Sequence, residues 1–510
     1  FIIPSFSPIL AQTENRSFPK NDATLTMPSN FKSKGYNLFS SSQLILPKAN
    51  YVIITNQSLY PYLDTFKNWK ITHGYAVEIV NISWISTNYE GIDLAEKIRN
   101  FLKETENNLG IDYLLIIGSH QTIPMRYCYP NGYSIRSIEV PTDFYYADLT
   151  GDWDADNDGY FGEIQDSPDF SAEIHVGRIP FDDPIIVSQF LEKTMTFQND
   201  TEPWKKKSLL LGSFLWLNNY KGHNYTETDG AALNEKLRKD IFVQNNFLQT
   251  TMYEKEGLAK SSYACDFSLN NSNLKSLWST GYGIVNWAGH GTIQTLQRLV
   301  WKKDNGDGIP YTGNDTIEPV TLFTNQKNSN VSDVFYLNDE TPSIIFSTGC
   351  DNAKIDEKNK KSLAESLLEN GAVVFIGSTR DVFGPFNWIS ELDGGIETLD
   401  YLFFDSFITK RDSVAKSLDI AKKKYNTNYM NIGETWWNYQ NLYSINIFGD
   451  PSVSIQEAPE APIIDGPSSV KKDKETAFQF NIIDYQQDIV YLQIDWGDGS
   501  NTGWKGPFSS

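Results

Sequence analysis

The fold of this chain is decided by the stretch Ile284-Val285-Asn286-Trp287-Ala288-Gly289-His290-Gly291-Thr292. A short apolar run ends there in a tight turn that places one histidine between two glycines. Such a run is typical of a strand buried in a parallel sheet. Ligands bind outside the carboxyl ends of strands in open parallel sheets, so His290 is predicted to face a ligand site. On this stretch alone, a turn histidine without a special role is an equal alternative.

A second stretch, Ser343-Ile344-Ile345-Phe346-Ser347-Thr348-Gly349-Cys350-Asp351, repeats the arrangement with a thiol in the turn. Lone cysteines are usually buried and inert, but Cys350 follows its apolar run instead of lying within it. A thiol that is activated by a neighbouring histidine attacks carbonyl groups. The backbone N–H groups of Gly291 and Cys350 are candidates for an oxyanion hole in such a reaction.

Strand-like runs alternate with helix-length segments over most of the chain, which predicts βαβ units. We expect an α/β fold, with an open, mostly parallel sheet and helices on both faces. Two subdomains are predicted, residues 49–200 and residues 201–456. The expected strands are residues 51–55, 76–80, 113–118, 173–177, 208–214, 283–287, 343–347 and 372–377, and the expected helices residues 60–73, 183–199, 229–242, 362–370 and 413–426.

The two ends of the chain differ in composition from this central part. Residues 1–48 are polar and irregular after an apolar start, so we expect a leader made of a signal-peptide remnant or a propeptide. Residues 457–462 form a proline-containing linker. The alternating segments 477–482 and 490–495 predict the start of a partial β-sandwich that is incomplete at Ser510.

The charge and the hydropathy of the chain exclude several classes of function. The net charge is −21, from 43 basic and 64 acidic residues, and such a charge repels nucleic acid and anionic membrane surfaces. No apolar run approaches the roughly 20 residues of a membrane span. Asn-x-Ser/Thr sequons, for example at Asn56 and Asn199, favour a secreted or cell-surface protein.

The chain has three cysteines, Cys128, Cys265 and Cys350, without a CxxC pair. A zinc site built on thiolates is therefore improbable. The odd number leaves at least one thiol free, as a cysteine nucleophile requires. Whether Cys128 and Cys265 form a disulfide is left open by the sequence.

The strand–Gly-His-Gly and strand–Gly-Cys turns together resemble the caspase-like clan of cysteine peptidases, which includes the gingipains. Three further blocks are similar to the gingipain family: Glu173–Arg178, Gly377–Arg380 and Phe448–Ser452. The resemblance extends over about residues 50–455. At the C-terminal end, residues 495–500 resemble the signature turn of PKD-type immunoglobulin-like domains.

The resemblance implies an endopeptidase that acts on proteins or peptides, with Cys350 as nucleophile and His290 as its proton-transfer partner. Family members use an acidic residue to orient the histidine, and Glu173 is the best match. The alternative for Glu173 is a strand-edge carboxylate paired with Arg178. No organic cofactor is implied, and a PKD-like domain would contact surface glycans or proteins. The family's specificity pocket does not map cleanly, and its loop candidates are Trp388, Glu391 and Asp393.

An acidic loop predicts a structural calcium site. Asp152, Asp154, Asp156 and Asp158 alternate with other residues before Gly159, as in oxygen-ligand Ca²⁺ loops. Position twelve of such a loop is Gln165 here, where Glu163 or Asp166 would substitute. Asp304 and Asp307 form a weaker second candidate, because turn chemistry alone explains them.

Two other functions remain open from the sequence. A transpeptidase of the same fold would transfer the acyl group to an amine instead of water. A non-enzymatic, calcium-stabilised surface-binding protein would account for the acidic loops, but it leaves the paired histidine and cysteine turns unexplained. The other histidines have no metal-ligand spacing and are interpreted as structural: His73, His120, His175 and His223.

Overall fold

The computed structural model describes residues 10–14, 50–73, 75–131, 138–327 and 331–455, and four strand segments beyond them. The chain divides into two compact units. The larger unit comprises residues 51–63 and 78–455. The smaller one comprises residues 1–50, 64–77 and 456–510.

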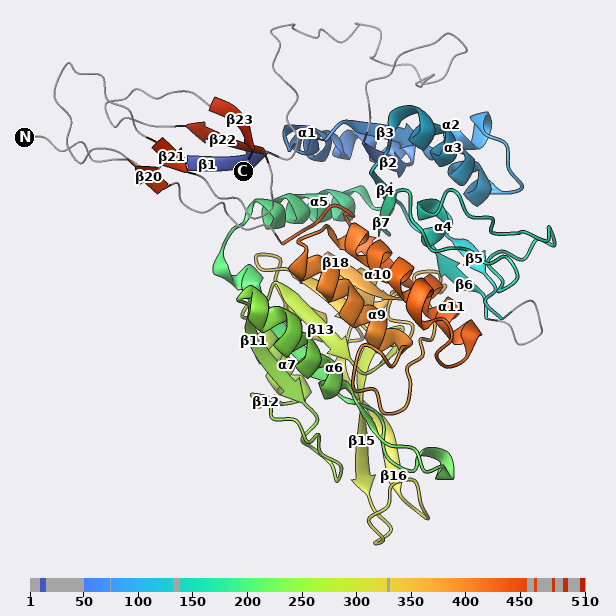
Figure 1. The fold of residues 1–510 in the computed structure, drawn as a ribbon, viewed down its shortest axis with the longest axis vertical. Coiled ribbons are helices and arrows are strands. Elements are labelled where there is room, and N and C mark those ends of the chain that lie inside the picture. Colours follow the sequence, from blue (N-terminus) through green and yellow to red (C-terminus); the bar gives the residue numbers. More distant parts are fainter. Residues whose placement is uncertain are drawn as a thin grey trace, which may run out of the picture. The chain divides into compact units, whose positions relative to one another are not determined.

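An eleven-stranded sheet is the centre of the fold (Figure 1), in the order β12-β11-β8-β13-β17-β18-β19-β7-β4-β2-β3. Its strands are β2 (Tyr51–Thr55), β3 (Val77–Asn81), β4 (Tyr113–Ile117), β7 (His175–Ile179), β8 (Lys207–Gly212), β11 (Leu248–Tyr253), β12 (Phe267–Ser268), β13 (Ile284–Ala288), β17 (Ser343–Ser347), β18 (Ala372–Ser378) and β19 (Ile445–Gly449). Most neighbours run parallel, which confirms the predicted α/β class.

Strand β19 connects the two halves of the sheet. It pairs antiparallel with β18, where Phe375 faces Phe448, and parallel with β7, where Phe448 faces Arg178. The sequence analysis did not identify this strand. Strands from both predicted subdomains thus share one sheet, and the division near residue 200 stays a prediction.

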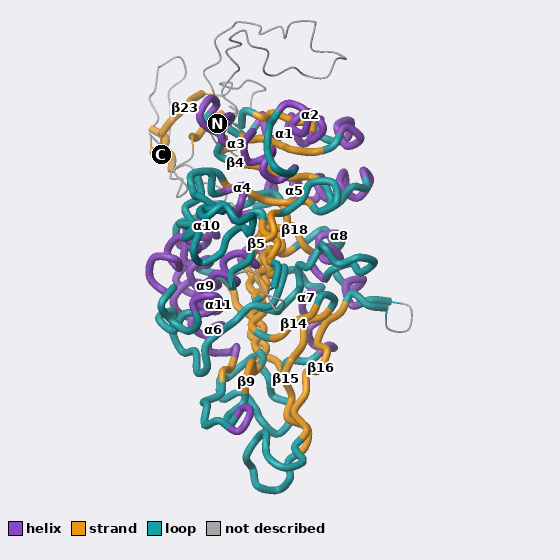
Figure 2. The backbone as a smooth tube through the Cα atoms, turned by 90° about the vertical axis from the view of Figure 1, so that its right-hand side faces the viewer, coloured by secondary structure: helices purple, strands orange, loops and turns teal. Residues whose placement is uncertain are grey.

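Helices cover both faces of the sheet, as Figure 2 shows with the sheet seen edge on. One face carries α6 (Gly230–Leu237), α9 (Gly395–Phe404), α10 (Val414–Tyr429) and α11 (Thr435–Ser444), and the other α5 (Pro184–Asn199), α7 (Asn271–Trp278) and α8 (Leu363–Glu369). The larger unit also contains α2 (Ile82–Asn88), α3 (Leu94–Leu109) and α4 (Phe144–Ala147). Covered on both faces, β13 and β17 are buried at every residue, which explains their uninterrupted apolar runs.

Side-chain caps fix where the predicted helices begin. The Asp183 carboxylate accepts hydrogen bonds from the backbone at the start of α5, and Pro184 occupies the first turn. Ser362 and Glu365 form a reciprocal capping box at α8. These are the residue types that satisfy the unpaired N–H groups of a helix start.

Short hairpins surround the carboxyl ends of the strands. They are β5 (Arg126–Cys128) with β6 (Val140–Thr142), β9 (Phe214–Trp216) with β10 (Thr228–Asp229), and β14 (His290–Thr292) with β15 (Thr295–Lys303) and β16 (Thr316–Thr324). The β15–β16 arm, which sequence analysis missed, packs on β9 through a buried cluster of Phe214, Leu217, Leu299 and Trp301. This cluster supports the strand beside the turns that carry His290 and Cys350.

The smaller unit contains α1 (Asp64–Thr72) and several strands. Strand β1 (Leu10–Glu14) pairs antiparallel with β22 (Ile489–Gln493), β22 pairs with β23 (Lys505–Ser509), and β20 (Ile463–Asp465) pairs with β21 (Gln479–Asn481). Strands β21 and β22 overlap the two strands expected there. The linker, the PKD-type turn and most of the leader lie outside the described residues, so these assignments stay predictions.

Two further expectations concern helices and disulfides. Among the described residues, no helix combines the length and the hydropathy that a membrane span needs. Cys128, Cys265 and Cys350 are all free thiols. The disulfide that the sequence left open is therefore not formed.

Candidate active site

The histidine turn and the cysteine turn lie side by side at the carboxyl ends of β13 and β17. These strands pair in parallel, with Trp287 opposite Ser347. Beyond them, the backbone N–H of Thr348 donates to the Trp287 carbonyl at 3.0 Å. A Cβ atom on Gly291 would lie only 2.8 Å from the Cys350 carbonyl oxygen, so the close approach of the two turns requires glycine there. The turns that the sequence analysis paired thus adjoin, and the roles of His290 and Cys350 stay predictions.

Asn352 joins the two turns through its side chain. Its Nδ2 donates to the carbonyls of Thr292, at 2.6 Å, and Thr295, at 3.1 Å. Its Oδ1 accepts a hydrogen bond from the Ser347 hydroxyl at 2.7 Å. The side chain is completely buried, so these hydrogen bonds are shielded from water. Sequence analysis missed Asn352, although an amide two residues after the nucleophile was the available signal.

The geometry of His290 fixes its tautomer. Nε2 lies 2.9 Å from the Leu215 carbonyl oxygen. A carbonyl only accepts, so Nε2 carries the hydrogen and Nδ1 of the neutral ring is left as the base. Burial lowers the pKa of His290 and outweighs the opposing contribution of this hydrogen bond. The imidazole is therefore neutral near pH 7.

Cys350 is a neutral thiol in this arrangement. Its Sγ donates to the Val382 carbonyl at 3.8 Å. Burial raises the pKa of Cys350 to about 12, and the nearby Asp381 carboxylate opposes ionisation further. No hydrogen bond joins His290 and Cys350, both of which the structure describes, so the resting site holds a thiol and an imidazole instead of an ion pair.

Glu173 is not placed at His290. Its carboxylate accepts hydrogen bonds from the N–H groups of Leu149, at 2.6 Å, and Thr150, at 3.2 Å, and from the Thr150 hydroxyl at 2.9 Å. It holds the turn after α4, and the atom that faces His290 Nε2 is the Leu215 carbonyl oxygen. A backbone carbonyl has no sequence signature, which explains why the sequence pointed to a carboxylate instead.

The alternative interpretation of Glu173 was a pair with Arg178, and it was wrong. Arg178 is completely buried and forms a two-point ion pair with Asp143, at 2.6 and 2.7 Å. Its remaining nitrogen donates to the carbonyls of Gly118 and Ile123. The guanidinium of Arg178 therefore stabilises the core next to β7 through these contacts.

The three loop candidates for a specificity pocket stabilise their own surroundings. Trp388 is buried, and its indole N–H donates to the Thr398 hydroxyl at 3.1 Å. Glu391 forms an ion pair with Lys236 at 3.0 Å. Asp393 accepts the N–H of Ile389 at 2.8 Å, which closes a local turn.

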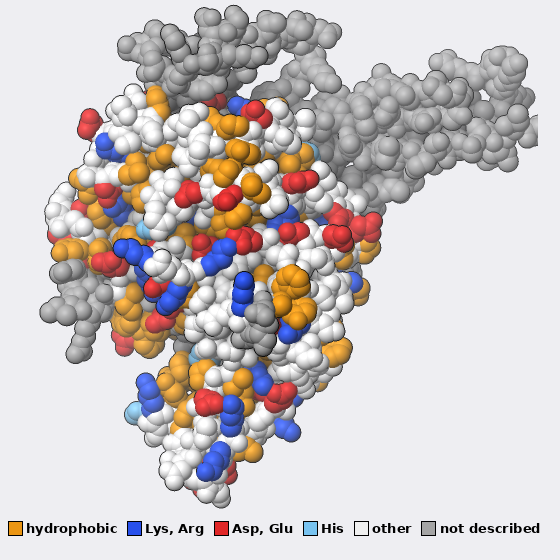
Figure 3. All heavy atoms as spheres, turned by 180° about the vertical axis from the view of Figure 1, so that it is seen from behind, with side chains coloured by type: hydrophobic (Ala, Val, Ile, Leu, Met, Phe, Trp, Pro, Cys, Tyr) orange, Lys and Arg blue, Asp and Glu red, His pale blue; other side chains and the backbone are white. Residues whose placement is uncertain are grey.

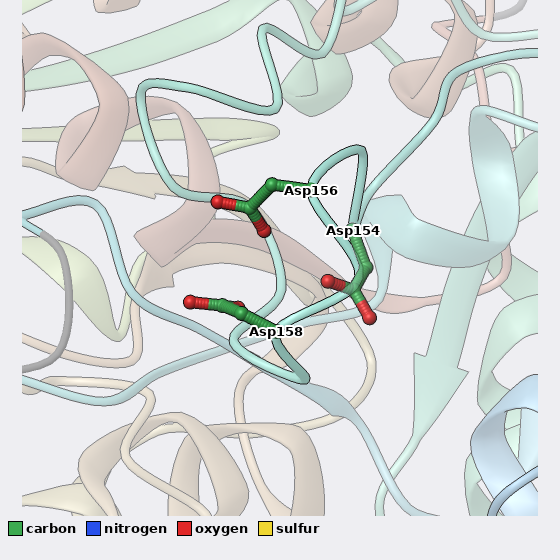
Figure 4. Close-up of side chains that lie close together, drawn as sticks. All are labelled: Asp154, Asp156 and Asp158. Carbon is green, nitrogen blue, oxygen red and sulfur yellow. The ribbon is translucent and has the colours of Figure 1, made fainter.

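Three carboxylates of the acidic loop come together (Figure 4). Asp154, Asp156 and Asp158 each offer an oxygen within 4.8 Å of the others. Three carboxylate oxygens are a suitable donor set for Ca²⁺. Asp152 and the buried Glu163 lie outside this group. Asp166 accepts the N–H groups of Ala155 and Glu163, so it shapes the loop.

The second acidic loop, between β15 and β16, has another organisation. Asp304 accepts the N–H of Gly308, and Asp307 accepts the N–H of Ile309 and the Thr312 hydroxyl. Within the described part of the chain, neither belongs to a group of three metal-ligating side chains. Turn hydrogen bonding accounts for both residues, as the alternative interpretation held.

The remaining histidines have structural contacts. His120 lies 3.1 Å from the Tyr127 hydroxyl, which donates to Asp356. His175 lies 2.7 Å from Asp419. Neither contact assigns them a catalytic role.

Comparisons with known proteins agree with this geometry. The family model of peptidase family C25 matches residues 45–456. No curated protein sequence matches the chain. The fold is similar to the crystal structure of the Arg-specific cysteine proteinase gingipain R, with a TM-score of 0.56 and 15% identity over 91% of this chain and 92% of that one. It is also similar to the complex of the RgpB pro- and mature domains from Porphyromonas gingivalis, with a TM-score of 0.53 and 13% identity over 88% of this chain and 96% of that one.

At identities this low, the structural similarity shows a shared fold. The family model goes further, because it matches most of the chain. The turns that carry His290 and Cys350 lie within the matched residues. The chain belongs to peptidase family C25, the gingipain family, and is a cysteine peptidase.

Proposed function

We propose that this chain is an endopeptidase that cleaves peptide bonds through an acyl-enzyme on Cys350, with His290 as general base and then general acid. The observation that carries the proposal is the pair of adjoining turns, of which one carries a neutral thiol and the other an imidazole whose Nε2 is held by the Leu215 carbonyl. The two turns supply the thiol and the base that a cysteine peptidase needs. A non-enzymatic surface-binding protein would need neither of them.

In the proposed reaction, His290 Nδ1 takes the thiol proton as Cys350 Sγ attacks the substrate carbonyl carbon. The thiol first turns away from the Val382 carbonyl, which accepts its hydrogen in the resting site. The proton on Nδ1 then passes to the leaving amine, and the C–N bond breaks. Water, deprotonated by the same nitrogen, adds to the thioester and releases the acid product and the free thiol.

The amides of Gly291 and Cys350 are the proposed oxyanion hole. Among the described residues, the Cys350 N–H donates to no backbone acceptor. Such a donor is available to an oxygen that becomes negative in the transition state. Gly291 lies against the Cys350 carbonyl, which brings the two residues close together.

The proposed setting is outside the cell or on its surface, and the proposed substrates are proteins or peptides. The sequons and the acidic charge support this setting. Figure 3 shows Lys, Arg, Asp and Glu side chains mixed among hydrophobic ones on one face of the molecule. A mixed surface does not direct binding toward one strongly charged polymer.

Calcium is the proposed structural ion, bound through Asp154, Asp156 and Asp158. The convergence of their carboxylates supports this proposal. Three negative charges in one exposed loop repel one another, and a divalent cation would remove that repulsion.

The experiment is turnover of a fluorogenic peptide library by the full chain and by Cys350→Ala and His290→Ala. Wild type is expected to cleave, and both variants are expected to lose more than roughly a thousandfold in kcat/KM. A thiol-directed peptidyl probe should label Cys350 in wild type but not in Cys350→Ala. Added amines that replace water as acceptor would instead indicate the transpeptidase. Neither cleavage nor labelling would refute the proposed function.

A further inference from the structure

Aromatic side chains from two loops gather beside His290. The aromatic cluster comprises Trp216, Tyr220, Tyr225 and Phe386. The Tyr225 and Phe386 rings stack nearly parallel, with centroids 4.0 Å apart and an angle of 4°. Phe386 also contacts Trp216 at 5.8 Å and Tyr220 at 6.1 Å. The rings thus form one continuous apolar surface.

The cluster is attached to both catalytic turns. The Trp216 ring meets His290 edge to face, with centroids 5.6 Å apart, and Trp216 follows Leu215, whose carbonyl holds Nε2. Phe386 lies on the loop that begins after β18 and includes Val382, the acceptor of the Cys350 thiol. A substrate group that is bound on these rings would therefore lie close to the reacting atoms.

The Thr228 side chain holds the two loops together. Its hydroxyl donates to the Pro385 carbonyl at 3.1 Å and accepts the Asn387 N–H at 2.7 Å. Residues on both sides of Phe386 are thereby fixed to β10. The ring is preorganised, which lowers the entropic cost of binding a ligand on it.

The stacked pair is exposed to solvent. Tyr225 is 38% exposed and Phe386 36%, and Ile389 and Leu392, further along the same loop, are 62% and 67% exposed. Such side chains contribute less to the core than buried aromatics. Contiguous exposed apolar surface typically marks a binding site, and aromatic faces pack well against other rings and aliphatic chains.

A positive charge beside the cluster opposes a basic ligand on the rings. The Lys221 ammonium lies over the Tyr220 ring, 5.1 Å from its centroid. The Glu227 carboxylate is engaged by the Asn218 side chain at 3.3 Å, and burial raises its pKa. A cation therefore already occupies one aromatic face, and the Asn218 amide engages the neighbouring acid.

We propose that the aromatic cluster binds a large apolar or aromatic side chain of the substrate next to the scissile bond, which makes the enzyme selective for such peptides. This inference rests on the proposed endopeptidase function. Phe386 and Tyr225 are the specificity-determining residues, and Trp216 connects the bound side chain to His290.

The test uses the full chain and peptides that differ only in residues flanking the scissile bond: Phe, Leu, Ala, Arg or Lys on either side. Wild type is expected to prefer Phe or Leu to Ala, Arg and Lys in kcat/KM. Phe386→Ala and Tyr225→Ala should reduce the Phe-to-Ala ratio roughly tenfold or more. Phe386→Leu should retain the preference for apolar peptides, because it keeps an apolar contact surface.

The matched control is Phe335→Ala, since Phe335 is 71% exposed and contacts Tyr336 instead of the cluster. It should leave the ratio unchanged. Labelling of Cys350 by a peptidyl probe with only Ala side chains reports the proposed function separately. Absent labelling in wild type contradicts that function. Normal labelling with equal cleavage of Phe, Ala and Arg peptides, or with a ratio unaffected by Phe386→Ala, overturns the specificity inference alone.

Discussion

The side-chain nitrogen of Asn352 lies 2.6 Å from the carbonyl oxygen of Thr292, and this hydrogen bond joins the cysteine turn to the histidine hairpin. A second bond to Thr295 and an accepted bond from Ser347 complete the connection. His290 and Cys350 follow different strands, β13 and β17. Their relative position therefore depends on contacts between the turns, and Asn352 provides two of the polar ones.

We expect Asn352→Asp to lower kcat by roughly 10- to 100-fold, with a smaller change in KM. The carboxylate keeps the acceptor for Ser347 but faces two carbonyl oxygens that need a donor. Steady-state kinetics measure the changes in kcat and KM separately. Alkylation of Cys350 by iodoacetamide measures the reactivity of the thiol without a peptide substrate. Ser347→Ala is the comparison variant that leaves both bonds between the turns in place: it removes the bond that Asn352 accepts and the bond that the Ser347 hydroxyl accepts from the Gly349 N–H. A positioning role is contradicted if turnover and alkylation fall equally.

The pH dependence follows from two opposite pKa shifts. Burial lowers the pKa of His290 and raises that of Cys350 to about 12. The base is lost when His290 is protonated, so kcat/KM should fall on the acid side, with a midpoint below pH 6.5. Ionisation of Cys350 should cause no change in kcat/KM between pH 7 and 10. A pH–rate profile tests this, and a midpoint well above 6.5 would refute the neutral-pair interpretation.

Removal of calcium should destabilise the protein if Asp154, Asp156 and Asp158 hold the ion. At a free Ca²⁺ concentration of 100 times Kd, the expected gain in unfolding free energy is about 2.7 kcal/mol. Thermal unfolding with Ca²⁺ and with a chelator measures the effect. Asp156→Asn should reduce it, whereas Asp304→Asn on the β15–β16 loop should not. An identical Tm in both conditions would exclude the site.

A buried acid in α9 predicts a pH-dependent stability. Burial raises the pKa of Glu397 from 4.5 to about 7, so the folded protein holds this proton more tightly than the unfolded chain. Its contribution is complete below pH 4.5 and is lost as the pH rises to 7. The loss amounts to about 3 kcal/mol.

Denaturant unfolding at pH 5 and pH 8 measures this difference. Glu397→Gln mimics the protonated acid and should show a smaller fall between the two pH values than wild type. Glu340→Gln, at an exposed position, should behave like wild type. Equal falls in wild type and Glu397→Gln would contradict the assignment.

The sequence predicted the parts of the fold that local pattern determines. The runs of β13 and β17 are apolar throughout because helices cover both faces, and their turns carry His290 and Cys350 at one edge. Strand β19 was missed because nothing in residues 445–449 encodes pairing with β18 and β7, which are distant in the chain. Asn352 and the Leu215 carbonyl were missed because their roles arise only from tertiary contacts. Glu173 was matched to the histidine-orienting acid by its position in a motif, and a motif position does not give the distance between Glu173 and His290.

The location of β19 has a consequence for how the protein is made. Because it is the last strand of the sheet in sequence and lies between β18 and β7, a ribosome must synthesise residue 449 before the two halves can join. Until then, both neighbouring strands expose unpaired edges, which are prone to faulty association. We expect nascent chains that end before Ile445 to require chaperone protection. Completion of the sheet therefore occurs late in synthesis, after the residues of both catalytic turns have left the ribosome's active centre.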